Sequence, residues 1–221
     1  GAREGATVTA YATDETKERV PMYVSLARQI AHLLEAKRTG DEDWFWLDAD
    51  YEVLVERVEQ KYIASVRVGH ADSQPIVEVR SLIQRLVNDV QVPVSVRVNS
   101  AGEESCTGLA YRVGSSARVS SLDQYGSLVP HALSGVGLHR LHPLNSGAQL
   151  ARAVARECVQ RELGHAVMVS ASWLPMETRP HQLRIRNERG DNLTKVCELE
   201  RFELKHLPET YRVAGQLTAA L

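Results

Sequence analysis

The stretch Val94-Ser95-Val96-Arg97-Val98 alternates apolar residues with polar ones, and its one charged residue is an arginine. Side chains on a β-strand point to opposite faces in turn, so the stretch predicts a strand with one buried face and one face that carries a guanidinium group. Four further stretches alternate in a similar way, at 64–68, 76–80, 109–113 and 183–186. Together they predict a sheet whose open face is lined with arginine.

The stretch 76–80 also fits a helix. Apolar residues recur at helical spacing from Ile76 to Val90, and Pro75 suits the first turn of a helix. We therefore expect a helix over 75–90, which removes Arg80 from the sheet. The arginines expected on the open face are then Arg67, Arg97, Arg112, Arg184 and Arg186.

The same periodicities predict the other elements of the fold. Apolar stripes and stop signals favour helices over 21–38, 50–62 and 146–163. Alternating or apolar runs predict strands over 6–13, 43–48, 63–69, 92–98, 107–113, 166–173, 181–187 and 193–204. The predicted fold class is α+β, with one central mixed sheet, about four helices and antiparallel hairpins in the second half.

The chain has 221 residues, enough for one large domain or two small ones. The segment 122–147 has no clear period and contains several glycines, prolines and histidines. Long segments without secondary structure usually serve as lids, binding loops or linkers. We expect a single domain over 1–221, and the alternative subdivision is 1–121 and 145–221 around that segment.

The composition indicates the cellular compartment of the chain and limits the classes of binding partner. The formal net charge is −2, so no global field draws the chain to a membrane or to nucleic acid. No apolar run reaches the ~18 residues of a transmembrane helix. The three cysteines are odd in number and far apart in sequence, which favours a reducing compartment. We expect a soluble, cytoplasmic protein with no membrane partner.

The familiar catalytic and cofactor motifs are absent from the sequence. It has no GxxxxGK[ST] loop, no GxGxxG after a strand, no HExxH and no GxSxG. His131, His139 and His142 fall in the irregular segment without the cysteine or carboxylate partners that zinc sites usually have. We therefore expect no metal, no other cofactor and no catalysis.

These observations favour a binding or sensor module. Arginine binds phosphate and carboxylate groups with a planar fork of donors, so the five arginines are the expected contacts of an anionic ligand, a nucleotide or a nucleic-acid backbone. One alternative is a structural subunit of an oligomer. In that case the arginines pair with the acidic first 62 residues of a neighbouring subunit.

A second alternative is a Mg²⁺-dependent nuclease. Asp191 is followed twelve residues later by Glu203-Leu204-Lys205, the spacing of an aspartate and a Glu-x-Lys on adjacent strands. In such nucleases the carboxylates hold Mg²⁺ and the lysine helps to activate water. The proline that usually precedes the aspartate is missing here.

Overall fold

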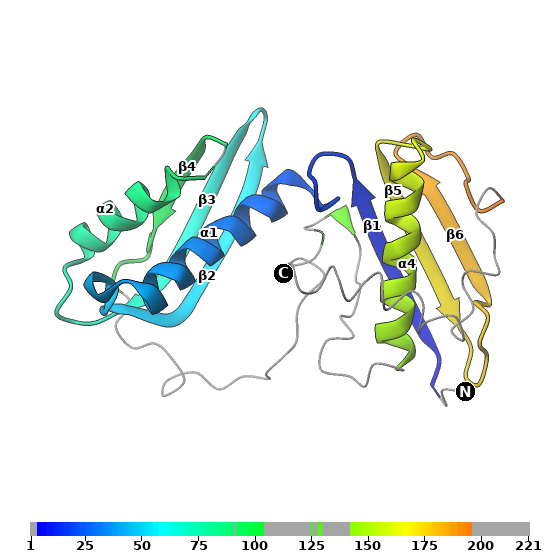
Figure 1. The fold of residues 1–221 in the computed structure, drawn as a ribbon, viewed down its shortest axis with the longest axis horizontal. Coiled ribbons are helices and arrows are strands. Elements are labelled where there is room, and N and C mark those ends of the chain that lie inside the picture. Colours follow the sequence, from blue (N-terminus) through cyan, green and yellow to red (C-terminus); the bar gives the residue numbers. More distant parts are fainter. Residues whose placement is uncertain (1–3, 91, 104–124, 126–127, 130–141, 196–221) are drawn as a thin grey trace. The chain divides into compact units, whose positions relative to one another are not determined.

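The computed structural model describes residues 4–90, 92–103, 125, 128–129 and 142–195. The chain divides into two compact units, and Figure 1 labels the elements of each. We call Met22–Ser115 the central unit, and Gly1–Pro21 together with Ser116–Leu221 the flanking unit. Each unit contains one three-stranded sheet among its described residues.

The central unit holds two helices against one face of its sheet. Its elements are α1 (Met22–Gly40), the 3₁₀ turn η1 (Glu42–Trp44), β2 (Leu47–Val58), β3 (Lys61–His70), α2 (Ile76–Val87) and β4 (Val94–Val98). The sheet order is β2-β3-β4. Strands β2 and β3 are antiparallel, whereas β3 and β4 are parallel because α2 makes the crossover between them. Leu26 and Ile30 of α1 and Ile83 of α2 are fully buried in the core of this unit.

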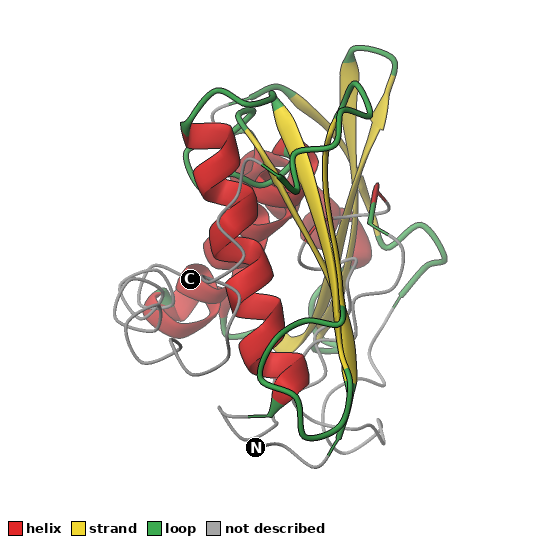
Figure 2. Ribbon diagram, turned by 90° about the vertical axis from the view of Figure 1, so that its right-hand side faces the viewer, coloured by secondary structure: helices red, strands yellow, loops and turns green. Residues whose placement is uncertain are grey.

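The flanking unit places one helix against one face of an antiparallel sheet. Its elements are β1 (Ala6–Thr13), α4 (Pro143–Gln160), β5 (Ala166–Trp173) and β6 (Gln182–Asn187), and the sheet order is β1-β5-β6. Val154 and Cys158 of α4 pack in one core with Val8, Val169 and Ile185 of the strands. In each unit the helices therefore cover a single face of the sheet, as Figure 2 shows by element type.

The predicted mixture of helix and strand is confirmed. The helices expected over 21–38, 75–90 and 146–163 are α1, α2 and α4. In the described part of the chain the strands form two three-stranded sheets in place of the one central sheet that we predicted. The pairing of strands distant in sequence separates the sheets, and local periodicity does not encode it.

The helix predicted over 50–62 is wrong, because these residues form β2 and the turn into β3. Leu54, Val55 and Val58 fit a helical spacing, but Val53-Leu54-Val55 is also a short apolar run that fits a strand, and pairing with β3 decides for the strand. The strand predicted over 43–48 is also largely wrong. Asp41 accepts a hydrogen bond from the backbone N–H of Asp43 and begins η1 there.

Other predictions fall on residues that the structure does not describe. They are the strand over 107–113, most of the segment 122–147 and most of the strand over 193–204. Within the described ranges, no helix combines the length and the apolar character needed to cross a membrane.

Candidate functional site

The face of β1-β5-β6 opposite to the core carries mainly polar side chains, in three rows across the strands. Residues that lie opposite each other in antiparallel strands point to the same face, so the register defines the rows. The rows are Thr7–Ser172–Gln182, Thr9–Ser170–Arg184 and Tyr11–Met168–Arg186. We call these nine residues the arginine face.

Arg184 and Arg186 lie together on this face. Both side chains are exposed, while Ile185 between them points into the core. Residues two apart on a strand are separated by roughly 7 Å, so the two guanidinium groups can reach one ligand. Among the described residues neither guanidinium has a carboxylate partner. The sequence pattern placed both arginines on the exposed side of their strand, and that is where the structure has them.

Hydroxyl groups line the arginine face beside these arginines. The Oγ1 of Thr7 lies 2.9 Å from the Oγ of Ser172, and the Oγ1 of Thr9 lies 3.0 Å from the Oγ of Ser170. Each hydroxyl can both donate and accept a hydrogen bond, so Ser170 and Ser172 can turn toward a ligand. The face therefore offers two cations beside a set of neutral donors and acceptors.

Arg67 and Arg97 share the open face of the other sheet, β2-β3-β4, and differ in what they contact. Arg67 forms ion pairs with Asp50, at 2.9 Å between Nη2 and Oδ1, and with Glu52, at 3.5 Å between Nε and Oε2. Burial opposes the charge of Arg67, but these contacts outweigh it and leave the pKa of Arg67 raised. Arg97 lies opposite Ser65 and is exposed. Arg67 is therefore already neutralised within its unit.

Arg112, the fifth arginine that we predicted on the open face, lies outside the described residues. The five positions do not make one site that the structure describes. Arg184 and Arg186 form one pair in the flanking unit, and Arg67 and Arg97 form another in the central unit.

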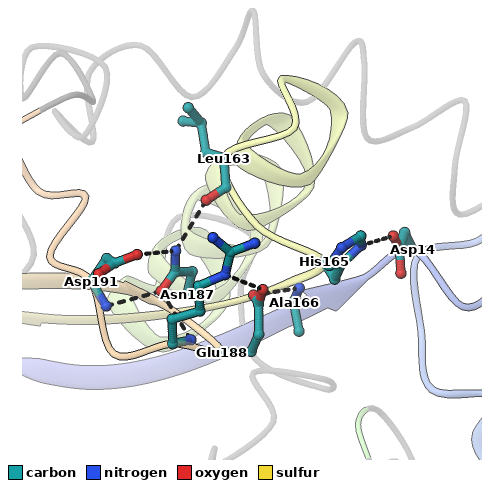
Figure 3. Close-up of polar contacts among 8 residues, drawn as sticks. Asp14, Leu163, His165, Ala166, Asn187, Glu188 and Asp191 are labelled. Carbon is teal, nitrogen blue, oxygen red and sulfur yellow. Dashed lines mark hydrogen bonds and ion pairs between the residues drawn. The ribbon is translucent and has the colours of Figure 1, made fainter.

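Asp191, which the nuclease hypothesis uses, closes a turn after β6. Its Oδ2 accepts a hydrogen bond of 2.9 Å from the Nδ2 of Asn187, and its backbone N–H donates to the Oδ1 of the same residue (Figure 3). Glu203 and Lys205 lie outside the described residues. Among the residues the structure covers, no group of three or more histidines, cysteines and carboxylates could hold a metal ion.

A second polar cluster, which no sequence pattern indicated, lies beside that turn. The Nδ1 of His165 lies 2.7 Å from the Oδ2 of Asp14, and the carboxylate of Glu188 accepts a hydrogen bond of 3.1 Å from the backbone N–H of Ala166 (Figure 3). His165 and Asp14 are 151 residues apart in sequence, so no local pattern reveals the pair. The hydrogen bond to Asp14, then the charges of Asp14 and Glu188, raise the pKa of His165.

We expect the His165–Asp14 pair to stabilise the protein mainly at low pH. The pKa of His165 is raised above its usual 6.5 in the folded state, so the stabilisation is fully present below about pH 6.5 and is lost as the pH rises through the folded pKa. His165→Gln should therefore lower the melting temperature more at about pH 5.5 than at about pH 8.5. Asp14→Asn should show the same dependence, and a pH-independent loss in both variants would contradict this account.

Comparison with known proteins finds similarity to S-adenosylmethionine synthases. No family model matches the chain. It is 28% identical over 202 residues to the S-adenosylmethionine synthase of Thermus thermophilus, and 26% identical over 204 residues to that of Deinococcus deserti. Both matches cover 84% of this chain and 50% of the relative, so the chain spans about half the length of the curated relatives it matches.

A solved structure has a similar fold. It is described as an unusual S-adenosylmethionine synthetase from Campylobacter jejuni, and it superposes with a TM-score of 0.75 at 19% sequence identity. The match covers 84% of this chain and 53% of that one. This similarity agrees with the mixed α and β fold described above.

Proposed function

We propose that this chain is a non-catalytic binding module that holds an anionic small molecule containing adenosine on the arginine face. The observation that carries the proposal is the pair Arg184 and Arg186, exposed, adjacent and without a carboxylate partner in the described residues. The likeness to S-adenosylmethionine synthases supports the adenosine part of the ligand.

The arginine face offers side chains that suit each part of such a ligand. The guanidinium forks of Arg184 and Arg186 can bind phosphate or carboxylate oxygens in a bidentate manner. The hydroxyls of Ser170 and Ser172 can exchange hydrogen bonds with a ribose. Met168, which is 36% exposed, offers apolar surface to a flat base.

Three probes separate these contributions in a calorimetric titration of the full chain at low salt. ADP carries adenosine and phosphates, S-adenosylmethionine carries adenosine and a carboxylate, and adenosine has neither anionic group. We expect affinity to fall in that order, because the arginines recognise the anion.

Removing both arginines should then remove most of the affinity for ADP. Hydrogen bonds to charged groups contribute about 1.5–3 kcal/mol each, so R184A/R186A should weaken ADP binding by roughly 100-fold or more. The matched control R161A/R189A removes two exposed arginines of the same unit, whose carboxylate contacts are long at 3.6 Å. Equal affinity of R184A/R186A and the control for ADP would refute the proposal.

A second candidate function is self-association through the open face of β2-β3-β4. Two apolar side chains of β2 are exposed on this face: Leu54 is 51% exposed and Val58 is 46% exposed. Glu52 lies on the same face of β2, and Arg97 lies on the same face of β4. A second copy could place its Arg97 against the acidic strand and cover the apolar side chains, which is the self-complementary pattern of a symmetric dimer.

We expect Leu54→Glu to abolish this association, because it buries an unpaired carboxylate at the centre of the contact. Sedimentation velocity at low and high ionic strength measures the effect. Val77→Glu is the control, since Val77 lies on α2 and is 72% exposed. A wild-type chain that stays monomeric at every ionic strength would exclude this candidate.

A further inference from the structure

Strand β2 lies at one side of its sheet, and among the described residues it pairs only with β3. It is 12 residues long, whereas strands in globular proteins usually have about five or six residues. Its pairing with β3 is regular from Tyr51 to Val58, and that stretch contains no proline, glycine or lysine. Short length, bulges, prolines and lysines are the usual protection of an outer strand against pairing with another chain. This stretch of β2 has none of them.

The hydrogen bonds of β3 show which backbone groups of β2 point out of the sheet. The carbonyl oxygen of Val66 accepts from the N–H of Asn99, and both backbone groups of Val68 bind the side chain of Asn99. Asn99 follows β4, so Val66 and Val68 direct these groups away from β2. Their partners in β2 are Val53 and Tyr51, which therefore form the pairs without mutual hydrogen bonds. The backbone groups of Tyr51 and Val53 point to the outer side of β2.

This orientation repeats at every second residue of an antiparallel strand, and so it extends to Val55 and Arg57. We call Tyr51, Val53, Val55 and Arg57 the free edge of β2. In the part of the chain that the structure describes, their backbone N–H and C=O groups have no hydrogen-bond partner. A row of unpaired donors and acceptors is a template for another extended segment.

The side chains beside the free edge define what such a segment must carry. Leu54 and Val58 are exposed on the open face of the sheet, and Glu56 lies between them on the same face. Glu56 lies opposite Ile63 of β3 and forms no ion pair with any other described residue. A strand added to β2 would place its own side chains next to these three. Apolar groups suit the two outer positions, and a cation suits the middle one.

We propose that the free edge of β2 binds an extended peptide segment by strand addition, and that the segment carries a lysine or arginine between two apolar residues at alternate positions. Backbone hydrogen bonds supply the affinity, and Glu56 with its apolar neighbours selects the sequence. The β2 strand of a second copy fits less well, because it carries glutamates of its own at 52 and 56.

This proposal is independent of the two considered above. The arginine face belongs to the flanking unit, whereas the free edge belongs to the central unit. Self-association through the open face of β2-β3-β4 uses side chains, whereas strand addition uses backbone groups at the side of the sheet.

The first test is amide hydrogen exchange of the full chain, followed by nuclear magnetic resonance with and without a probe peptide. The probe is the capped heptapeptide Thr-Val-Thr-Lys-Thr-Val-Thr. Without it, we expect the amides of Val53 and Val55 to exchange fast and those of Leu54 and Glu56 to exchange slowly, because the latter two point toward β3. At saturating probe, exchange at Val53 and Val55 should slow by about tenfold or more.

Two results of this test would overturn the proposal. One is unchanged exchange at Val53 and Val55 in the presence of the probe. The other is slow exchange at both residues without the probe, because the edge is then already occupied. Dilution identifies the occupant in that case: protection that falls on dilution indicates a second copy, and constant protection indicates another part of the same chain.

The second test measures affinity for the fluorescently labelled probe by anisotropy. Val53→Pro removes an outward N–H and leaves the hydrogen bonds to β3 in place, so it should weaken binding by about tenfold or more. Val53→Ala is the matched control, because it shortens the same side chain and keeps the N–H. Equal affinities of V53P and V53A would contradict strand addition, and Arg57→Pro repeats the measurement if V53P does not fold.

The third test exchanges charges across the contact. Glu56→Lys should weaken binding of the probe by about threefold, and should strengthen binding of a probe with glutamate in place of lysine by a similar factor. Glu42→Lys changes an exposed glutamate outside the strands of the same unit and should leave both affinities unchanged. The same preference for the lysine probe in E56K and in the wild type would overturn the assigned segment.

Discussion

Replacing Asn99 with alanine is expected to cost about 4 kcal/mol of the free energy of unfolding of the central unit. The Asn99 side chain is buried and pairs with both backbone groups of Val68. Its Oδ1 accepts from the N–H of Val68 at 2.8 Å, and its Nδ2 donates to the carbonyl oxygen of Val68 at 2.9 Å. Alanine would leave two buried backbone groups of β3 without partners, at about 1–3 kcal/mol each.

The backbone of Asn99 adds to this cost. Its φ of 42° is left-handed, and alanine adopts that region less readily than asparagine does, by about 1 kcal/mol. Asn99→Gly is therefore the matched control, because it removes the amide but permits the conformation. Urea unfolding followed by circular dichroism measures both variants. Asn99→Ala should be less stable than Asn99→Gly. An unfolding midpoint of Asn99→Ala equal to that of the wild type would contradict the assigned hydrogen bonds.

Replacing Gly147 with valine is expected to cost about 3 kcal/mol in the flanking unit. A Cβ atom at this position of α4 would lie 2.7 Å from Cζ3 and 3.0 Å from Cη2 of Trp173. Trp173 is 2% exposed and cannot move away without disturbing the core between α4 and β5. Helix and strand approach closely here because Gly147 has no side chain.

Tryptophan fluorescence during urea unfolding reports this variant directly, because Trp173 is the residue displaced. Gly40→Ala is the control. Gly40 also lies in a helix, and nothing surrounds the position its Cβ would take. We expect G40A to change the free energy of unfolding by less than about 0.5 kcal/mol. Equal unfolding midpoints for G147V and G40A would show that the close contact with Trp173 is not tight.

Local sequence patterns were enough to predict the elements whose residues fit only one type of secondary structure. Helices α1, α2 and α4 each carry an apolar stripe, and their periodicity has no competing alternation over its full length. The segment 50–62 fits both a helix and a strand. Its partner strand β3 decides between them, and that pairing is a tertiary interaction which propensity does not encode.

The same limit applies to the candidate sites. Alternation along 183–186 was enough to place Arg184 and Arg186 on the exposed side of β6. It could not show that Asp50 neutralises Arg67, because that ion pair requires β2 to lie beside β3. The hydrogen bonds from Arg152 to the carbonyl oxygens of Glu18 and Arg19 join segments more than a hundred residues apart, and they form only because α4 packs beside the loop.

The central claim is that an anion binds against Arg184 and Arg186 on the open face of β1-β5-β6. The most direct measurement is nuclear magnetic resonance of the arginine Nε–Hε groups in the ¹⁵N-labelled full chain during a titration with ADP. The account predicts that the signals of Arg184 and Arg186 shift and saturate together, while the signal of Arg67 stays in place. Unchanged Arg184 and Arg186 signals at saturating ADP would contradict it.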